Sequence, residues 1–512
     1  MTSLSARLLL AAATLLVVPL LAPLGAQAPL SAPAASVPPA ISAIRQQDLE
    51  RDLYTMAGDS MRGREAGTLD ELRASVWLAE QMRQIGLAPK GDGGSWLQWF
   101  NIRRTRISAG ATTVRIGGRP YALWTDVVPV TNAAITVSAP TKFVGDARDD
   151  STIDLHGRVA VATLVAPPAA SVRATTNTHD YNYARAAITA ISRALGSRGA
   201  AAVILVADSI TDAVFDDVAR VQARGSYDVV DGTPRFSRNG SATRPPAIPV
   251  LLVHRAALGG LRADGQVADI HVGMETFEYP SANVVGAVQG TDPALRGEYV
   301  VFSSHQDHDG VRYAVASDSI WNGADDNAST SVALLAIARA WVKQPSKRSA
   351  LFIFHGAEER GLLGSRYHTA HPVVPLNSIV ALLNGDMIGR NHPDTAALLG
   401  SQPPHRNSAT LVGMAIEANL ATSRFVIDSS WDRPSHPEGW YFRSDHVPYA
   451  QLQVPSLFFS TNLHPDYHTP RDEPKGIDYP KLTRMTRWIY MTGWIAANAA
   501  QRPAIDPGFV LR

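Results

Sequence analysis

The fold is decided by a stretch that opens with the apolar run Tyr299-Val300-Val301-Phe302 and continues to Arg390. Along it follow four polar clusters: Ser304-His305-Gln306-Asp307, Gly323-Ala324-Asp325-Asp326-Asn327, His355-Gly356-Ala357-Glu358-Glu359 and Asn384-Gly385-Asp386-Met387. Each cluster follows a strand-like run or opens a helix-like run. In open α/β sheets, ligands bind at the carboxyl ends of the strands. The pattern therefore predicts an α/β fold with its functional site at that edge of the sheet.

The side chains in these clusters are those that a two-metal hydrolytic site needs. Such a site has one carboxylate between two cations, a His and a further carboxylate for each cation, and another carboxylate as general base. The chain offers these groups from five places: His305, Asp325, Glu358-Glu359, Asp386 and, well downstream, His468. No other part of the sequence contains a comparable group.

The place of each residue in the sequence suggests a role. Asp325 suits the bridge, because it lies in a glycine-containing turn at the start of a helix. Of the neighbours Glu358 and Glu359, one is expected to bind metal while the other faces the water. Asp307, two residues from His305, is expected to orient that imidazole.

Each cluster also has a plainer interpretation. A pair of acidic residues before a helix often only caps it or complements its dipole. Five such coincidences in a consistent α/β order are harder to accept than one metal site. The remaining nearby side chains fill no required place and are expected on the surface or behind the ligands: His308, Asp309, His355, His368, His371 and His464.

Composition excludes several classes of protein. The chain has 512 residues, enough for two to four domains, and a formal net charge of +1. Such a balance gives no electrostatic case for nucleic acid or an anionic membrane as a partner. There are no cysteines, so disulfides and thiolate zinc sites are excluded and a metal must use His, Asp and Glu.

The N-terminus has the pattern of a signal peptide, predicted for residues 1–28. Arg7 precedes an apolar run over residues 8–21, and Ala26-Gln27-Ala28 resembles a cleavage site. Cleavage after Ala26 or Ala34 and an uncleaved anchor are the alternatives. We expect an exported protein, periplasmic or extracellular, with no stable membrane anchor.

The rest of the chain divides by composition. Residues 29–40 are rich in Pro, Ala and Ser and are predicted to be a flexible leader. Residues 41–138 and 273–512 are predicted to form one catalytic domain. Residues 139–272 carry strand-like runs but no concentrated His, Asp or Glu cluster, and are predicted to be an inserted domain.

The ordered motifs His-x-Asp, Gly-Ala-Asp-Asp-Asn-x-Ser, Ala-Glu-Glu-x-Gly-Leu-Leu-Gly-Ser, Asn-x-Asp-Met and His-Thr resemble those of the co-catalytic zinc aminopeptidases, a family that includes glutamate carboxypeptidase. The resemblance covers most of residues 41–500. It implies the zinc-exopeptidase fold, a mixed central β-sheet sandwiched by helices. It also implies that the inserted segment is a β-rich α+β protease-associated domain.

The resemblance implies a role for each motif residue. Two zinc ions per subunit would be held by His305, Asp325, Glu359, Asp386 and His468, with Asp325 as the bridge and a cis peptide bond between Asp325 and Asp326. Glu358 matches the general base, and Tyr467 matches a tyrosine that stabilises the oxyanion in some members. Arg443 lies in a motif that resembles a substrate-side loop. The residues from Val311 to Ile320 form a longer insertion, which we expect to line part of the substrate pocket.

The function predicted from the sequence is therefore that of a secreted zinc exopeptidase that removes N-terminal residues from peptides. A carboxypeptidase or dipeptidase of the same family is the alternative, and Arg443 is then a candidate for holding the free carboxylate. A glutaminyl cyclase and a non-catalytic binding protein are further alternatives, which the complete ligand set disfavours. The sequence gives no indication of oligomeric state or side-chain preference.

Overall fold

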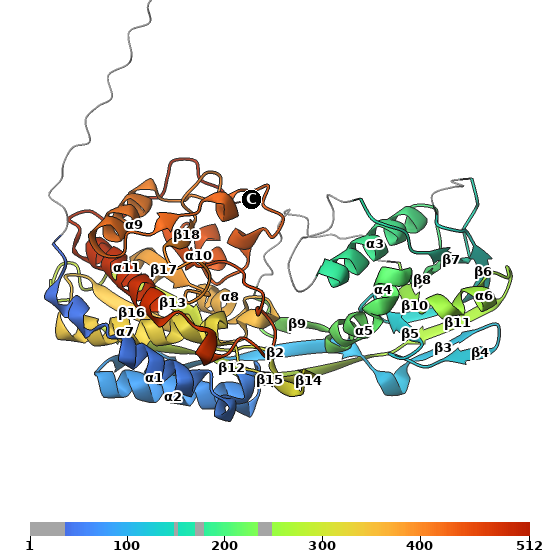
Figure 1. Cartoon of the computed structure of the whole chain (residues 1–512), viewed down its shortest axis with the longest axis horizontal. Coiled ribbons are helices and arrows are strands. Elements are labelled where there is room, and N and C mark those ends of the chain that lie inside the picture. Colours follow the sequence, from blue (N-terminus) through green and yellow to red (C-terminus); the bar gives the residue numbers. More distant parts are fainter. Residues whose placement is uncertain (1–35, 148–151, 169–178, 234–247, 512) are drawn as a thin grey trace, which may run out of the picture. The chain divides into compact units, whose positions relative to one another are not determined.

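The computed structural model describes residues 36–147, 152–168, 179–233 and 248–511 (Figure 1). The predicted signal peptide and most of the predicted leader lie outside these ranges. Within them, no helix combines the length and the apolar character needed to cross a membrane.

The larger sheet has ten strands and carries the polar motifs. In spatial order, its main path is β19 (Val426–Ile427), β18 (Thr395–Leu399), β20 (Ser456–Ser460), β17 (Ile379–Gly385), β13 (Tyr299–His305), β16 (Ser349–His355), β12 (Met274–Val288), β2 (Leu97–Ile107) and β9 (Ser226–Val229), and β1 (Ala88–Pro89) pairs with β12. Neighbours among β20, β17, β13 and β16 are parallel, whereas β18 and β12 join them antiparallel. The sheet is mixed, as predicted.

Helices pack on both faces of this sheet. Alternate residues of β13 show this, because Val300 and Phe302 belong to one hydrophobic core and Val301 to another. The first core includes side chains of α1 (Gln46–Met56), α2 (Leu69–Ile85), α7 (Thr330–Lys343), α9 (Ala409–Thr422) and α11 (Tyr479–Asn498). The second includes Tyr449 of α10 (His446–Gln451), which neighbours α8 (Leu363–Ala370). This confirms the predicted sheet sandwiched by helices.

A second sheet, of eight strands, contains the predicted inserted segment. Its order is β4 (Arg119–Tyr121), β3 (Thr113–Ile116), β11 (Val267–Val272), β6 (Ile135–Phe143), β7 (Val159–Thr163), β8 (Ala202–Val206), β10 (Val250–Val253) and β5 (Val127–Pro129). The helices in this part of the chain are α3 (His179–Gly196), α4 (Ser209–Ala213), α5 (Phe215–Arg224) and α6 (Leu258–Leu261). Each face of the sheet has its own core, with Val203 and Leu205 of β8 in one and Ile204 in the other.

The predicted boundary at residue 139 needs correction. The second sheet already begins at Thr113, since β3 and β5 pair with β11 and β10. These partners lie more than a hundred residues further along the chain, so no local pattern near residue 113 marks the boundary. In addition, Ser226–Val229, within the predicted insertion, pairs with β2 of the larger sheet.

Candidate active site

Four parallel strands bring the motifs to one edge of the larger sheet. His305, at the end of β13, pairs in register with His355 at the end of β16. Gly385, at the end of β17, pairs with Phe459 near the end of β20. The segments that follow these strands carry the acidic and histidine side chains, so the sequence motifs meet where the strand pattern predicted.

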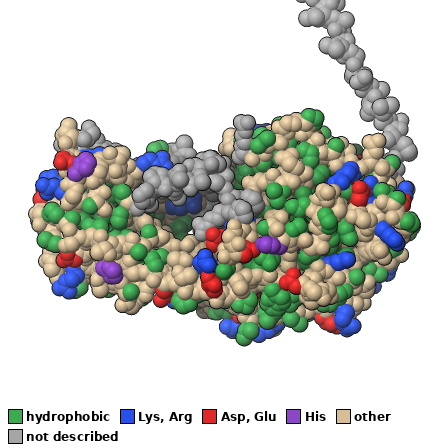
Figure 2. Space-filling model, turned by 180° about the vertical axis from the view of Figure 1, so that it is seen from behind, with side chains coloured by type: hydrophobic (Ala, Val, Ile, Leu, Met, Phe, Trp, Pro, Cys, Tyr) green, Lys and Arg blue, Asp and Glu red, His purple; other side chains and the backbone are tan. Residues whose placement is uncertain are grey.

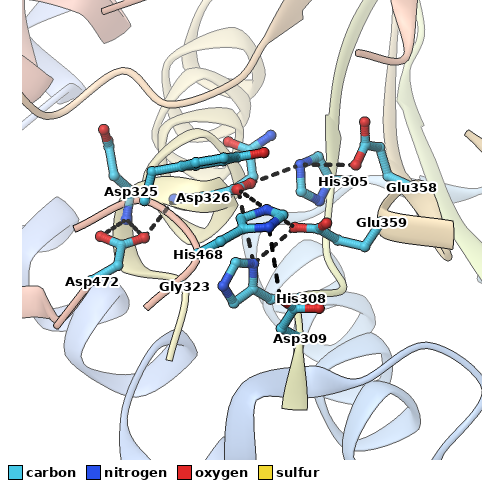
Figure 3. Close-up of polar contacts among 12 residues, drawn as sticks. His305, His308, Asp309, Gly323, Asp325, Asp326, Glu358, Glu359, His468 and Asp472 are labelled. Atoms are coloured by element: carbon cyan, nitrogen blue, oxygen red, sulfur yellow. Dashed lines mark hydrogen bonds and ion pairs between the residues drawn. The ribbon is translucent and has the colours of Figure 1, made fainter. Parts of the chain in front are cut away.

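The first group of side chains consists of His308, Asp326, Glu359 and His468. His468 Nε2 lies 3.1 Å from Asp326 Oδ2 and 3.1 Å from Glu359 Oε1. His308 Nδ1 lies 3.0 Å from the same Glu359 oxygen. All four side chains thus direct an N or O atom toward a common centre (Figure 3).

The second group consists of His305, Glu358 and Asp386. His305 Nε2 lies 3.5 Å from Asp386 Oδ1 and 3.8 Å from Glu358 Oε2. It also lies 3.2 Å from Oδ1 of Asp326, whose Oδ2 belongs to the first group. The Asp326 carboxylate therefore lies between the two groups, as Figure 3 shows.

The structure corrects the prediction that Asp325 is the bridge. The Asp325 Oδ1 accepts a hydrogen bond from the Gly389 N–H at 2.7 Å, and its Oδ2 lies 3.6 Å from His464 Nε2. Asp472 accepts from the backbone N–H groups of both Asp325 and Asp326, at 3.0 Å for each of its shortest contacts. These hydrogen bonds to Asp472 fix which of the two adjacent carboxylates faces the histidines. The sequence near residue 325 does not indicate this contact.

The cis peptide bond also lies one residue later than the resemblance implied. It joins Asp326 to Asn327. Gly323 lies in the same turn, at φ 58°. A Cβ at this position would lie 2.2 Å from the backbone oxygen of Asp326 and 2.4 Å from the His308 ring. Glycine is therefore required for the turn to pass this close to the site.

Asp307 contacts His305 as predicted, but through its backbone oxygen, while its carboxylate acts on the glutamates. His305 Nδ1 lies 3.1 Å from the backbone oxygen of Asp307 but 3.8 Å from its carboxylate. That carboxylate accepts from the N–H groups of Glu358, at 2.9 Å, and Glu359, at 3.3 Å. Asp307 thus holds the turn at Glu358–Arg360 that presents both glutamates.

Sequence reasoning missed His308 and Asp309, both fully buried in the described structure. The spacing of His308 three residues after His305 was the available signal. Asp309 Oδ2 lies 3.7 Å from His468 Nδ1, and the Asp309 carboxylate is paired with Arg224, Arg312 and Arg360. Asp309 therefore connects a site histidine to a cluster of guanidinium groups.

Tyr467 and Arg443 lie together beside His468. The Arg443 Nη2 donates to the Tyr467 hydroxyl oxygen at 2.8 Å, and the Tyr467 ring stacks on the His468 ring with centroids 3.9 Å apart. Arg443 is itself paired with Glu438 at 2.9 Å. Its positive charge is therefore largely committed to residues of the protein.

Burial and the neighbouring charges shift the pKa values of the acidic and histidine side chains in the site. Burial raises the pKa of Glu358 well above its ordinary value, with the neighbouring carboxylates of Asp445 and Glu359 adding to the effect of burial and His305 opposing it. For His468, burial lowers the pKa, but Glu359 and Asp326 outweigh it and raise the pKa to about 10. These shifts follow from the close packing of carboxylates and imidazoles in a buried site.

The donor set fits cations. Two ligand atoms about 2.1 Å from a tetrahedral zinc ion lie roughly 3.4 Å apart, close to the 3.0–3.5 Å separations of the shortest contacts in the two groups. Within the described structure, His305 Nε2 and Asp386 Oδ1 are buried without a hydrogen-bond partner. Buried polar atoms are normally satisfied, so these orphaned atoms themselves indicate a missing ligand.

Comparisons with known proteins identify the class of protein. The chain is 24% identical over 489 residues to Aminopeptidase YwaD of Bacillus subtilis, across 92% of this chain and 91% of that one. Its structure resembles an aminopeptidase from Aneurinibacillus sp. strain AM-1, with a TM-score of 0.55 and 19% identity over 91% of this chain and 97% of that one. It also resembles BSAP, a zinc aminopeptidase from Bacillus subtilis, with a TM-score of 0.54 and 19% identity over 93% and 100% of the two chains. The fold is thus that of the zinc aminopeptidases.

A match to a family model covers a shorter part of the chain. The model of peptidase family M28 matches residues 283–492, which contain all the residues of the two groups. The second sheet, between Thr113 and Val272, lies outside the match. Its assignment to a protease-associated domain stays a prediction.

Proposed function

We propose that the protein is an exported zinc aminopeptidase that hydrolyses N-terminal residues from peptides with two zinc ions per subunit. The observation that carries the proposal is the position of the Asp326 carboxylate between His305 and His468, at 3.2 and 3.1 Å. The substrate class is supported by the similarity to the aminopeptidases named above. Export is supported by the signal-like sequence of residues 1–28.

Each ion would have its own set of ligands. One would be held by His305 and Asp386, the other by Glu359 and His468, and Asp326 would bridge them. His308 lies in the first group, with Glu359 and His468, and would complete or support that set of ligands. When bound, the ions supply Lewis-acid chemistry, polarising the scissile carbonyl and lowering the pKa of water.

Glu358 is the proposed general base. Its carboxylate belongs to the second group, and its raised pKa suits a group that takes a proton from water and returns it to the leaving amine. Asp307 fixes its backbone through the 2.9 Å hydrogen bond described above. Tyr467, held by Arg443, is the proposed donor to the developing oxyanion.

A set of matched peptides tests the proposal. The zinc-loaded protein is incubated with one neutral sequence in four forms, with the N-terminus free or acetylated and the C-terminus free or amidated, and the products are measured by mass spectrometry. We expect stepwise loss from free N-termini only. Loss from free C-termini alone would refute the aminopeptidase assignment.

The Glu358→Gln variant provides the matched control. It keeps the shape of the side chain and loses the base, so zinc content should persist while turnover falls by about 100-fold or more. Full activity with metal bound would contradict the role given to Glu358.

A further inference from the structure

A cavity opens beside His468 and joins the candidate active site to the predicted insertion. Its volume is 640 Å³. It is lined by residues of α3 and α5, by the hairpin of β14 (Gly310–Val315) and β15 (Asp318–Trp321), and by the segment 468–471. The hairpin is the insertion that the sequence predicted to line a substrate pocket.

The lining of this cavity contains more arginines than carboxylates: Arg220, Arg224, Arg312 and Arg471 against Asp180, Asp217 and Asp309. Arg224 of α5 and Arg312 of β14 both line it, and their side chains are 26% and 14% exposed. Both pair with Asp309, as does Arg360 at 3.2 Å. Arg360 also reaches Glu65 at 3.4 Å, so three guanidinium groups share two carboxylates.

The guanidinium groups of Arg224 and Arg312 have more N–H donors and more positive charge than Asp309 satisfies. Among the described residues, Arg312 bonds Asp309 through Nη1 and Arg224 bonds it through Nη2, while a guanidinium carries five N–H groups. Burial lowers the pKa of Arg312, and although Asp309 opposes this shift, the like charge of Arg224 adds to it. A further anion at this wall would relieve the repulsion.

Aromatic rings hold the guanidinium groups in place. Arg312 lies over the Trp321 ring at 4.2 Å, and Arg220 lies over the Tyr313 ring at 4.1 Å. Arg220 is otherwise paired with Asp217 at the cavity. On the face of the molecule in Figure 2, in contrast, basic and acidic side chains are interspersed and form no large patch of either sign.

We propose that this cavity is a carboxylate subsite of the active site, in which Arg224 and Arg312 select short peptides that carry a carboxylate within about two residues of the scissile bond. The distance follows from His468, which belongs to the first group and also lines the cavity. An extended peptide advances about 3.3 Å per residue, so one or two residues span from the site into the cavity. The carboxylate is that of an Asp or Glu side chain or of the C-terminus of a di- or tripeptide.

This inference rests on the proposed peptidase function, and its test separates the two. Hydrolysis is compared for short peptides with Glu or Gln at the first, second or third position, each with a free or an amidated C-terminus. We expect kcat/KM to be on the order of tenfold higher with a carboxylate in the favoured position, the usual effect of a hydrogen bond to a charged group. A higher kcat/KM for the Glu peptide than for the Gln peptide indicates that the subsite binds a side-chain carboxylate. A higher kcat/KM for the free C-terminus than for the amidated one indicates that it binds the terminal carboxylate.

Variants show whether the arginines are responsible. Arg312→Gln and Arg224→Gln should reduce the carboxylate preference to near unity, and Arg312→Lys should restore part of it. A purely structural disturbance of His468 would instead lower kcat/KM for both members of a pair and leave their ratio intact. Arg115→Gln removes an exposed guanidinium that bonds only Gly118 among the described residues, and should keep the wild-type ratio.

Binding gives a readout that does not depend on turnover. The same peptide pairs are titrated into the zinc-loaded Glu358→Gln protein. Cleavage of neutral peptides without any carboxylate preference in rate or binding would overturn the subsite and leave the proposed function standing. Absence of cleavage of every peptide by the wild type would overturn the proposed function, while a carboxylate preference in binding that Arg312→Gln abolishes would still support the subsite.

Discussion

Asp325 and Asp326 are adjacent, chemically identical and both buried, yet their surroundings differ completely. Asp325 accepts from a backbone N–H and neighbours Asp472, so burial and that carboxylate raise its pKa to about 8. Asp326 faces His305 and His468, which outweigh burial and hold its pKa well below the ordinary value. A cation is attracted where the carboxylate is ionised, which is why the proposed bridge is the second residue of the pair.

Substitution of each aspartate tests this difference. Asp326→Asn removes the charge between the two groups, so we expect the purified protein to lose at least one of two bound zinc ions. Asp325→Asn keeps an acceptor for the Gly389 N–H and should retain both. Zinc is measured by inductively coupled plasma mass spectrometry after dialysis, and equal zinc contents in the two variants would show that Asp326 is not the bridge.

Metal binding should release protons. In the metal-free site the pKa of His468 is raised to about 10, and that of His305 is raised well above its ordinary value by Glu358 and Asp386 despite burial. Both imidazoles are then protonated at pH 7, whereas a metal binds only the neutral form. Zinc binding should therefore release about two protons, and zinc affinity should rise with pH.

Calorimetric titration with zinc in buffers of different ionisation enthalpy measures this number. His468→Ala should reduce it by about one. If the heat did not depend on the buffer, the histidines would already be neutral and the shifts described above would be wrong.

At the scale of elements, the packing of α11 against β13 depends on one small residue. A Cβ at Gly493 of α11 would lie 2.3 Å from Cζ of Phe302 of β13. Because that ring packs at 5.1 Å from the buried Trp341 ring of α7 and 5.2 Å from the buried Phe352 ring of β16, it cannot move away freely.

Alanine at this position should therefore destabilise the protein. We expect Gly493→Ala to lower the free energy of unfolding by about 1–3 kcal/mol, the range for overpacking a core. Gly413→Ala in α9 is the matched control, since nothing lies within 4 Å of its added Cβ, and it should be neutral or stabilising by about 0.5–1 kcal/mol. Urea unfolding measures the free energy of unfolding of both variants. A smaller loss of this free energy in Gly493→Ala than in Gly413→Ala would contradict the packing argument.

Elements with local signals were predictable from the sequence. The helix at Leu69–Ile85 has such signals, because Thr68 caps its start and Gly86, at φ 99°, ends it. The parallel strands β16 and β17 were recognisable as continuous apolar runs. The start of the second sheet at Thr113 was not, because β3 is defined by its pairing with β11.

The same distinction holds for the site. The motifs predicted which segments meet, since that depends on strand ends in a parallel sheet. They did not predict which member of a pair faces inward, because Asp472 decides this from a distant loop. His308 was missed although it follows His305 by three residues, because its direction depends on the turn at Gly323 and on the Glu359 carboxylate.

At the scale of the whole molecule, the described residues form separate hydrophobic cores around two sheets. The cores of the second sheet draw on residues between Ile107 and Met274. The cores around the larger sheet draw on residues before and after this range, together with Tyr227 and Val229 of β9. The contacts between the two sets include ion pairs such as Arg224 with Asp309 and Arg366 with Asp228. Exposed or partly exposed ion pairs contribute little to cooperativity compared with shared apolar surface.

We therefore expect two unfolding transitions, of which only one responds to zinc. All the residues proposed as ligands belong to the part built on the larger sheet, so a zinc excess of about a thousandfold over the dissociation constant should stabilise that part by about 4 kcal/mol. Its Tm should rise by several degrees, while the transition of the second sheet stays in place. Scanning calorimetry with zinc and with a chelator measures both, and Asp326→Asn should abolish most of the shift. A single transition that moves as a whole would show that the ion pairs and the strands β2 and β12, which run through both parts, couple them into one cooperative unit.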